Sequence, residues 1–292
     1  MGRLVFYTNR SNEQSAYCFG NRIAEKMGMP IDIPLAELRS DDILIFVKST
    51  FRNIHLVAKL VKKVYYAVGC GWRPIHKYVY PYISLLLTTP RACAVYKEYY
   101  PENEVIWIPL AHSNDENLVR PLVRAVKKVV SNGTQRAFTD TKWAVFDKKI
   151  REKGFETERI VLPYEEAYKR GDVCRRFCRD FLLNADISVS YRKGVKETKG
   201  DVELRLKPPN KLNGAGSVMV PSVAYPEFCF EENHDKKGCY LPANTIDEMV
   251  EQCCKLRNDK ELYRKIATGA HEGAKEYHID KVIPYYEKLL CA

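Results

Sequence analysis

The sequence lacks the features that would place it in several large classes of protein. It has no apolar run near the roughly 20 residues that a membrane-spanning helix needs. Its first residues lead directly into a strand pattern and not into the apolar segment of a signal peptide. Phe6 stands where an N-myristoylation signal has Ser or Thr. These absences predict a soluble cytoplasmic protein without a lipid anchor.

Motifs for metals and for familiar catalytic groups are also absent. The 10 cysteines include no Cys-x-x-Cys unit, and the 6 histidines lie at no metal-ligand spacing. The sequence contains no Asp-x-Asp, no nucleotide-triphosphate P-loop and no Ser/His/Asp arrangement. We therefore expect reduced, buried cysteines, no structural metal and no resident cofactor.

The chain carries an excess of positive charge. The formal net charge is +10, and it is shared equally between residues 1–125 and the remainder of the chain. A basic excess of this size favours polyanionic partners such as DNA, or an anionic membrane surface.

Strand and helix patterns alternate through all 292 residues. This alternation predicts an α/β protein with two Rossmann-like, doubly wound domains facing a cleft, residues 1–125 and 126–292, joined within Pro109–Ala125. The expected strands are Leu4–Thr8, Ile43–Val47, Val64–Val68, Ile83–Leu87, Val105–Ile108, Lys128–Ser131, Glu158–Leu162, Ile187–Ser190 and Val218–Val223. The expected helices are Glu13–Met27, Ile54–Lys63, Pro90–Tyr99, Thr141–Lys153, Arg175–Asn184, Ile246–Leu256, Lys260–Glu276 and Ile279–Leu290.

A cationic loop precedes the last expected strand. Arg205, Lys207 and Lys211 surround Pro208-Pro209, and a small-residue segment, Asn213-Gly-Ala-Gly-Ser, follows. Such a loop can hold a diphosphate by point charge and by amides at a helix N-terminus. The alternative is a basic surface loop before an ordinary helix.

Two strand-to-helix turns carry further candidates. After the first strand of the second half, Gly133 would let the backbone approach a phosphate and Arg136 would add charge, although a plain turn fits equally well. The corresponding turn of the first half contains Asn9, Ser11, Asn12 and Glu13. Ser11 is a helix N-cap in one interpretation. In the other, this loop binds the acceptor and Glu13 touches its hydroxyls.

Several segments resemble one enzyme family. Pro209-Asn-Lys-Leu and Pro221-Ser-Val-Ala-Tyr-Pro-Glu are similar to a motif of GT-B glycosyltransferases, in the large retaining family that uses nucleotide sugars. Asp186-Ile-Ser-Val-Ser and Gly238-Cys-Tyr-Leu-Pro-Ala resemble a strand and a turn of the same donor domain. The resemblance implies the GT-B fold, a UDP-sugar co-substrate, no metal, and Lys207, Lys211 and Arg205 on the donor phosphates.

The sequence departs from that family at one functional position. The glutamate that contacts the donor ribose in the family falls at Gly214. Asn213, Glu203 and Glu227 are the candidates to contact the ribose or sugar in its place.

Acceptor residues are expected in the first half. Cationic and aromatic residues follow a strand among several tyrosines, namely Trp72, Arg73 and Lys77. They could bind a nucleic acid backbone with stacked bases, or an anionic membrane surface. In the third interpretation the tyrosines are partly buried in the core. His112 follows a strand near the predicted cleft. One interpretation makes it a catalytic residue together with Glu13, and the other makes it a surface or hinge histidine.

The chain is basic, short for the family and free of an anchor, as phage-type DNA glycosyltransferases are. Hydroxymethylpyrimidine in DNA is therefore the leading acceptor. The alternatives are a glycan or lipid-linked acceptor at a membrane, and a non-catalytic nucleic-acid-binding protein on the same scaffold.

Overall fold

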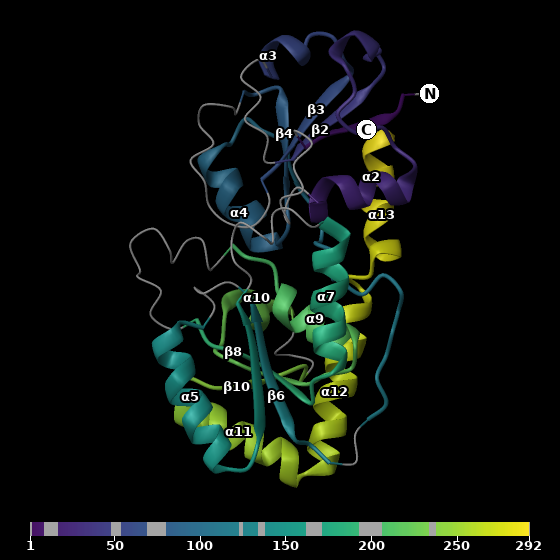
Figure 1. Cartoon of the computed structure of the whole chain (residues 1–292). Coiled ribbons are helices and arrows are strands. Elements are labelled where there is room, and N and C mark those ends of the chain that lie inside the picture. Colours follow the sequence, from purple (N-terminus) through teal and green to yellow (C-terminus); the bar gives the residue numbers. More distant parts are fainter. Residues whose placement is uncertain are drawn as a thin grey trace.

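The first half of the chain forms one parallel sheet (Figure 1). The computed structural model describes residues 2–8, 17–47, 54–68, 80–122, 125–133, 138–161, 171–192, 206–233 and 238–291. The sheet has five strands in the order β1-β2-β3-β4-β5, all parallel. They are β1 (Leu4–Tyr7), β2 (Ile43–Val47), β3 (Lys63–Ala67), β4 (Ile83–Leu87) and β5 (Val105–Trp107).

The chain reverses direction across this sheet beside β1. Its first crossover passes through η1 (Tyr17–Asn21, π-helical) and α2 (Arg22–Met27) to Ile31, which bridges Phe6 in parallel on the side of β1 away from β2. The chain then returns through η2 (Leu35–Glu37) to β2. This sheet therefore has a switch point between β1 and β2, as a doubly wound sheet requires.

Helices cover both faces of the first sheet. α2 packs on the face that carries Leu4 and Ile43, whereas α3 (Ile54–Val57) and α4 (Pro90–Tyr99) pack on the opposite face. α4 begins at the predicted residue because Thr89 caps it, accepting a hydrogen bond from the amide of Ala92, and Pro90 occupies the first turn.

The second half repeats this architecture. Its sheet has the order β10-β9-β8-β6-β7, again all parallel, so its switch point lies between β6 and β8. The strands are β6 (Lys128–Gly133), β7 (Glu156–Val161), β8 (Ile187–Ser190), β9 (Ser222–Ala224) and β10 (Leu241–Pro242). α5 (Asp140–Glu152) packs on one face, and α7 (Gly171–Leu183) and α9 (Asn210–Ser217) pack on the other. α10 (Phe228–Asn233) joins β9 to β10.

Close packing of α9 explains the small-residue segment of the sequence. α9 lies against α12 (Lys260–Lys275), and a Cβ atom added at Gly216 would come within 2.3 Å of the carbonyl oxygen of Ala270. Any larger side chain at position 216 would push the two helices apart.

The chain ends by returning to the first domain. α11 (Ile246–Asn258) and α12 complete the second domain, but α13 (Ile279–Glu287) and η4 (Lys288–Leu290) lie beside α2 (Figure 1). Ile279, Val282 and Tyr286 are buried in the same core cluster as Leu4 and Phe6. The predicted second domain, 126–292, thus contains a helix that packs on the first sheet.

Most predicted elements are confirmed to within a few residues, with three corrections. The helix expected over Ile54–Lys63 ends at Val57. The strand expected over Val218–Val223 begins only at Ser222, because Met219 adopts a left-handed φ of 63° and closes α9: its amide donates to Gly216 and that of Val220 donates to Ala215. α9, α10 and the short strand β10 were absent from the predicted elements.

Within the described part of the chain, no helix has the length and apolar character needed to cross a bilayer.

Candidate functional site

Cationic side chains gather where β6 and β8 end, beside the second switch point. Lys211 lies in the first turn of α9, and its Nζ atom donates a hydrogen bond of 2.8 Å to the carbonyl oxygen of Asn132 on β6. Lys207 stands half-buried just before the same helix. Two lysines of the cationic loop are therefore held at the edge where doubly wound sheets bind ligands.

Arg192 is a third cation of this site, and the sequence analysis missed it. It lies two residues beyond β8, and its Nε atom donates to Oε1 of Glu227 at 2.6 Å. Both side chains are nearly buried, with exposed fractions of 10% and 4%. The signal was available, because Arg192 closely follows the strand Ile187–Ser190 that the sequence predicted.

The electrostatic surroundings of Lys211 disfavour its charged form. Its pKa is lowered to about 7, first by burial and then by the nearby Arg192. Lys207 and Arg159 also lower this pKa, whereas Glu227 raises it. Among the described groups that act most strongly on Lys211, three are cations and one is a carboxylate, which suits a ligand with several negative charges.

Two of the predicted donor-binding residues hold buried polar atoms without a partner among the described residues. Asn213 is fully buried, and neither its amide oxygen nor its amide nitrogen has a hydrogen-bond partner. Oε2 of Glu227 is buried and unpartnered as well. Buried polar atoms in native proteins are nearly always satisfied, so these atoms are candidates to contact a ligand.

The loop that carries Lys207 also touches the first domain. Leu206 is buried in the core cluster that includes Ala92, and its carbonyl oxygen accepts a hydrogen bond of 3.5 Å from the hydroxyl of Thr89. The guanidinium of Arg91 lies 4.3 Å from the centre of the Phe228 ring. These contacts join the first turn of α4, which follows β4, to the loops around α9 and α10, so the carboxyl ends of the two sheets face each other.

Gly133 ends β6 with a φ of 140°, a conformation that favours glycine. It follows Asn132, whose carbonyl oxygen accepts the hydrogen bond of Lys211, so Gly133 is adjacent in the chain to a residue that binds this lysine.

His112 lies elsewhere, in the segment that crosses between the domains. It is buried, its ring centroid is 5.5 Å from that of His278, and its backbone amide donates to Tyr277 at 2.9 Å. Burial lowers its pKa to about 3, with a further contribution from His278, so the ring is neutral at pH 7. Within the described ranges, no hydrogen bond or ion pair joins His112 to Lys211. Its catalytic role stays a prediction.

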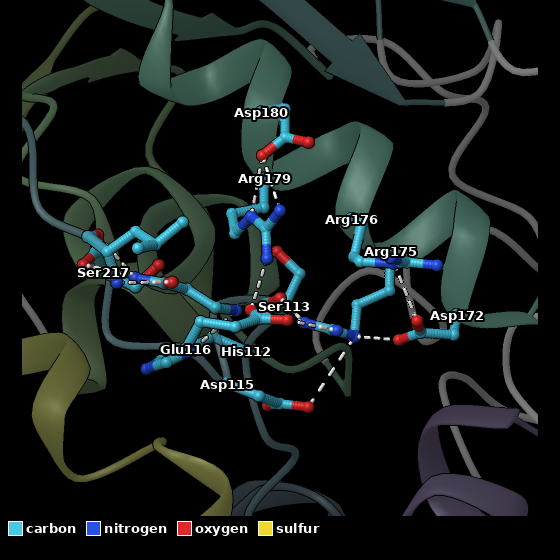
Figure 2. A network of polar contacts seen from close by, with 12 residues as sticks. His112, Ser113, Asp115, Glu116, Asp172, Arg175, Arg176, Arg179, Asp180 and Ser217 are labelled. Atoms are coloured by element: carbon cyan, nitrogen blue, oxygen red, sulfur yellow. Dashed lines mark hydrogen bonds and ion pairs between the residues drawn. The ribbon is translucent and has the colours of Figure 1, made fainter.

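A network of ion pairs holds this crossing segment to the second domain (Figure 2). Arg175 of α7 donates to both carboxylate oxygens of Glu116, at 2.7 and 3.0 Å, and to Asp172 at 2.7 Å. Arg179, one turn further along α7, also pairs with Glu116. These arginines hold the pKa of the Glu116 carboxyl well below its usual value.

The same crossing segment is tied to the first domain by Arg22 of α2. Arg22 is buried, pairs with Asp115 and donates to the carbonyl oxygen of His112 at 2.6 Å. Residues 111–116 are therefore clamped between α2 and α7. The sequence did not indicate this network, because Glu116 lies 59 residues from Arg175 and Asp115 lies 93 residues from Arg22.

The remaining predicted site residues lie outside the described residues, and their roles stay predictions. They are Asn9, Ser11, Asn12, Glu13, Trp72, Arg73, Lys77, Arg136, Glu203 and Arg205.

Among the comparisons with known proteins, only the one with solved structures found matches. No protein-family model matches the chain, and no curated protein sequence matches it. Solved structures do. The HepE protein of Anabaena, solved with UDP and glucose, superposes with a TM-score of 0.63 at 8% identity, and the match covers 100% of both chains.

Two further structures are similar at the same level. A UDP-forming α,α-trehalose-phosphate synthase from Burkholderia vietnamiensis matches with a TM-score of 0.64 at 10% identity, over 94% of this chain and 76% of its own. TarM from S. aureus, solved with UDP, matches with a TM-score of 0.60 at 11% identity, over 95% of this chain and 58% of its own. The chain thus spans less than two thirds of TarM. Together with the two parallel five-stranded sheets, these likenesses show that the chain has the GT-B fold of glycosyltransferases.

Proposed function

We propose that this protein is a glycosyltransferase that moves a sugar from a nucleotide diphosphate donor, a UDP-sugar, to an acceptor hydroxyl. The observation that carries the proposal is the group of cations at the second switch point, formed by Lys211, Lys207 and Arg192. Support for UDP comes from neighbours of this fold that were solved with that nucleotide.

In this proposal the cations act when the donor bond breaks. The departing diphosphate gains negative charge, and fixed positive charges stabilise that charge where it develops. Lys207 and Lys211 are proposed to bind the phosphates, with Arg205, Gly133 and Arg136 as further phosphate-binding residues. The sequence has no Asp-x-Asp, so we propose that the reaction needs no metal.

Donor hydroxyls are the proposed partners of the unsatisfied buried atoms. Asn213 offers an amide donor and acceptor, and Glu227 offers its Oε2 atom. Glu203 is the third candidate. An amide at position 213 would replace the glutamate that the resembling family has at the position of Gly214.

The first domain is proposed to present the acceptor, through the turn from Asn9 to Glu13 and the segment with Trp72, Arg73 and Lys77. We propose hydroxymethylpyrimidine in DNA as the acceptor, on the support of the net charge of +10. If the protein is instead a non-catalytic nucleic-acid-binding protein on the same scaffold, it will bind DNA but transfer no sugar.

A second candidate acceptor is a glycan or lipid-linked molecule at an anionic membrane. A specific observation favours it: Leu56 and Leu60 are 50% and 56% exposed beside the exposed Lys59 and Lys62, and Tyr82 is 50% exposed at the start of β4. Exposed leucines with flanking lysines suit a lipid surface and add nothing to DNA binding.

The test combines donor binding with transfer. UDP is expected to raise the midpoint of thermal unfolding, because a ligand that binds only the folded state stabilises it. Labelled UDP-sugars are then incubated with hydroxymethylated duplex DNA or with anionic lipid vesicles carrying hydroxyl acceptors. The absence of any stabilisation by UDP, ADP or GDP, together with no transfer, would refute the proposal.

A further inference from the structure

The amine of Lys211 is surrounded by charges from four different parts of the second domain. The groups that face it are Arg159 on β7, Arg192 after β8, Lys207 before α9 and Glu227 before α10. Three of these four groups are cations. The amine itself is fixed by its hydrogen bond of 2.8 Å to the carbonyl oxygen of Asn132.

The only carboxylate among these groups is already paired. Glu227 accepts the hydrogen bond of Arg192 at 2.6 Å, so its charge is offset by that guanidinium first. Arg159 has its own partner in Asp140, at 2.9 Å. Among the described residues, no ion pair joins Lys211 to a carboxylate, and the nearly buried Arg192 guanidinium adds positive charge nearby. In the site without ligand, a charged amine at this position is disfavoured, in agreement with its lowered pKa of about 7.

A bound diphosphate reverses this balance. It brings two or more negative charges to the edge where the three cations converge, and an anion next to an amine favours the charged form. We propose that this site takes up a proton together with the diphosphate, that Lys211 receives the proton, and that Arg192 is the positioning residue that keeps Lys211 neutral beforehand. The step is a proton transfer from solvent to the Nζ lone pair, and the proton returns to solvent when the nucleotide leaves.

This inference rests on the proposed function, because it assumes a diphosphate ligand. It adds a property that fixed point charges do not have: the affinity for the donor depends on pH above neutrality.

Calorimetry at pH 8 tests the inference directly. UDP is titrated into the wild-type protein in Tris and in HEPES, whose ionisation enthalpies differ, and the difference in heat gives the number of protons taken up. The second pKa of a phosphate monoester is about 6, so the ligand is already ionised at pH 8. We expect a net uptake of up to one proton per UDP, and a dissociation constant that rises by up to about tenfold between pH 8 and pH 9, the limit for one linked proton.

Two variants test whether Lys211 is the group that takes up the proton. Lys211→Arg keeps the charge but does not titrate here, so its proton uptake is expected to fall to about zero and its affinity to lose the pH dependence. Lys128→Arg is the matched control, because Lys128 begins the same strand β6 and pairs with Glu158 at 2.5 Å. It is expected to retain the wild-type proton count.

Arg192→Gln tests the positioning role. It removes the cation beside Lys211 and frees Glu227, and both changes favour a charged amine in the empty site. The proton uptake at pH 8 is expected to fall to less than half of the wild-type value, whereas a purely structural role would leave it unchanged.

Each outcome decides the inference. Binding of UDP without proton uptake, or with uptake that persists in Lys211→Arg, overturns it and leaves the proposed function standing. If the wild-type protein binds none of UDP, ADP and GDP, both fail. If Lys211→Arg does not fold, the pH dependence of the wild type and of Arg192→Gln still decides.

Discussion

Two glycines in α9 are expected to respond to alanine with opposite signs. A Cβ atom at Gly216 would come within 2.3 Å of the Ala270 carbonyl oxygen and 2.8 Å of its carbon. The obstacle is backbone, so α9 and α12 must separate. Overpacking of this kind costs about 1–3 kcal/mol. A Cβ atom at Gly214 would instead meet the Leu182 side chain at an ordinary 3.5 Å. Gly214→Ala should therefore gain about 0.5–1 kcal/mol from helix propensity.

The assay is thermal unfolding followed by circular dichroism, with the two single variants and the wild type measured together. For a domain of this size, 1 kcal/mol shifts the midpoint by about 2–4 °C. Gly216→Ala is expected to unfold several degrees below the wild type and Gly214→Ala slightly above it. A Gly216→Ala variant as stable as the wild type would show that α9 does not lie this close to α12.

Four further outcomes are expected. Lys211→Gln should weaken UDP binding about 10- to 100-fold in calorimetry, as the loss of one charge-assisted hydrogen bond would; an unchanged affinity would remove Lys211 from the site. His112 has a folded-state pKa lowered to about 3, so its contribution to stability is present above its unfolded value of 6.5 and is lost as the pH falls below that value. The loss is about 1.4 kcal/mol per pH unit below about 6, and His112→Asn should flatten the profile of unfolding free energy against pH. Arg175→Gln removes the buried guanidinium that pairs with both Glu116 and Asp172 and should lower the unfolding free energy by about 2–3 kcal/mol in urea titrations, whereas exposed Arg176→Gln should change it little. EDTA should leave UDP binding and transfer unchanged; loss of activity that Mg²⁺ or Mn²⁺ restores would refute metal independence.

Local sequence patterns were sufficient to predict much of the fold. Runs such as Ile43–Val47 and Ile83–Leu87 are apolar throughout because both faces of a parallel sheet are covered, and the structure has strands at those residues. α4 was predictable because its cap and its first-turn proline are adjacent in sequence.

Features that depend on contacts distant in sequence were not predictable. α9 has a composition of glycine, serine and asparagine that favours turns, and it is a helix because α12 accepts its small side chains. Similarly, nothing near Glu116 in the sequence indicates that Arg175 and Arg179 pair with it.

The candidate site was predicted in part. Lys207 and Lys211 were candidates because they stand in a cationic loop that resembles a family motif, and Gly133 was a candidate because it follows a predicted strand. Arg192 was missed because one cation after a strand has no motif, and its importance becomes visible only through Glu227 and Lys211.

The return of α13 to the first sheet limits how the two domains can move. Within the described residues, the chain passes between them through residues 111–116 and again between α12 and α13. The amide of His112 donates to the carbonyl oxygen of Tyr277 where these two passages lie together. Two bodies joined by adjacent connections can rotate about the line through those connections but can hardly slide or separate. Any change in the angle between the two domains would then follow one rotation axis near His112 and His278, and a fragment cut at residue 125 would lose both the axis and the helix that covers its own core.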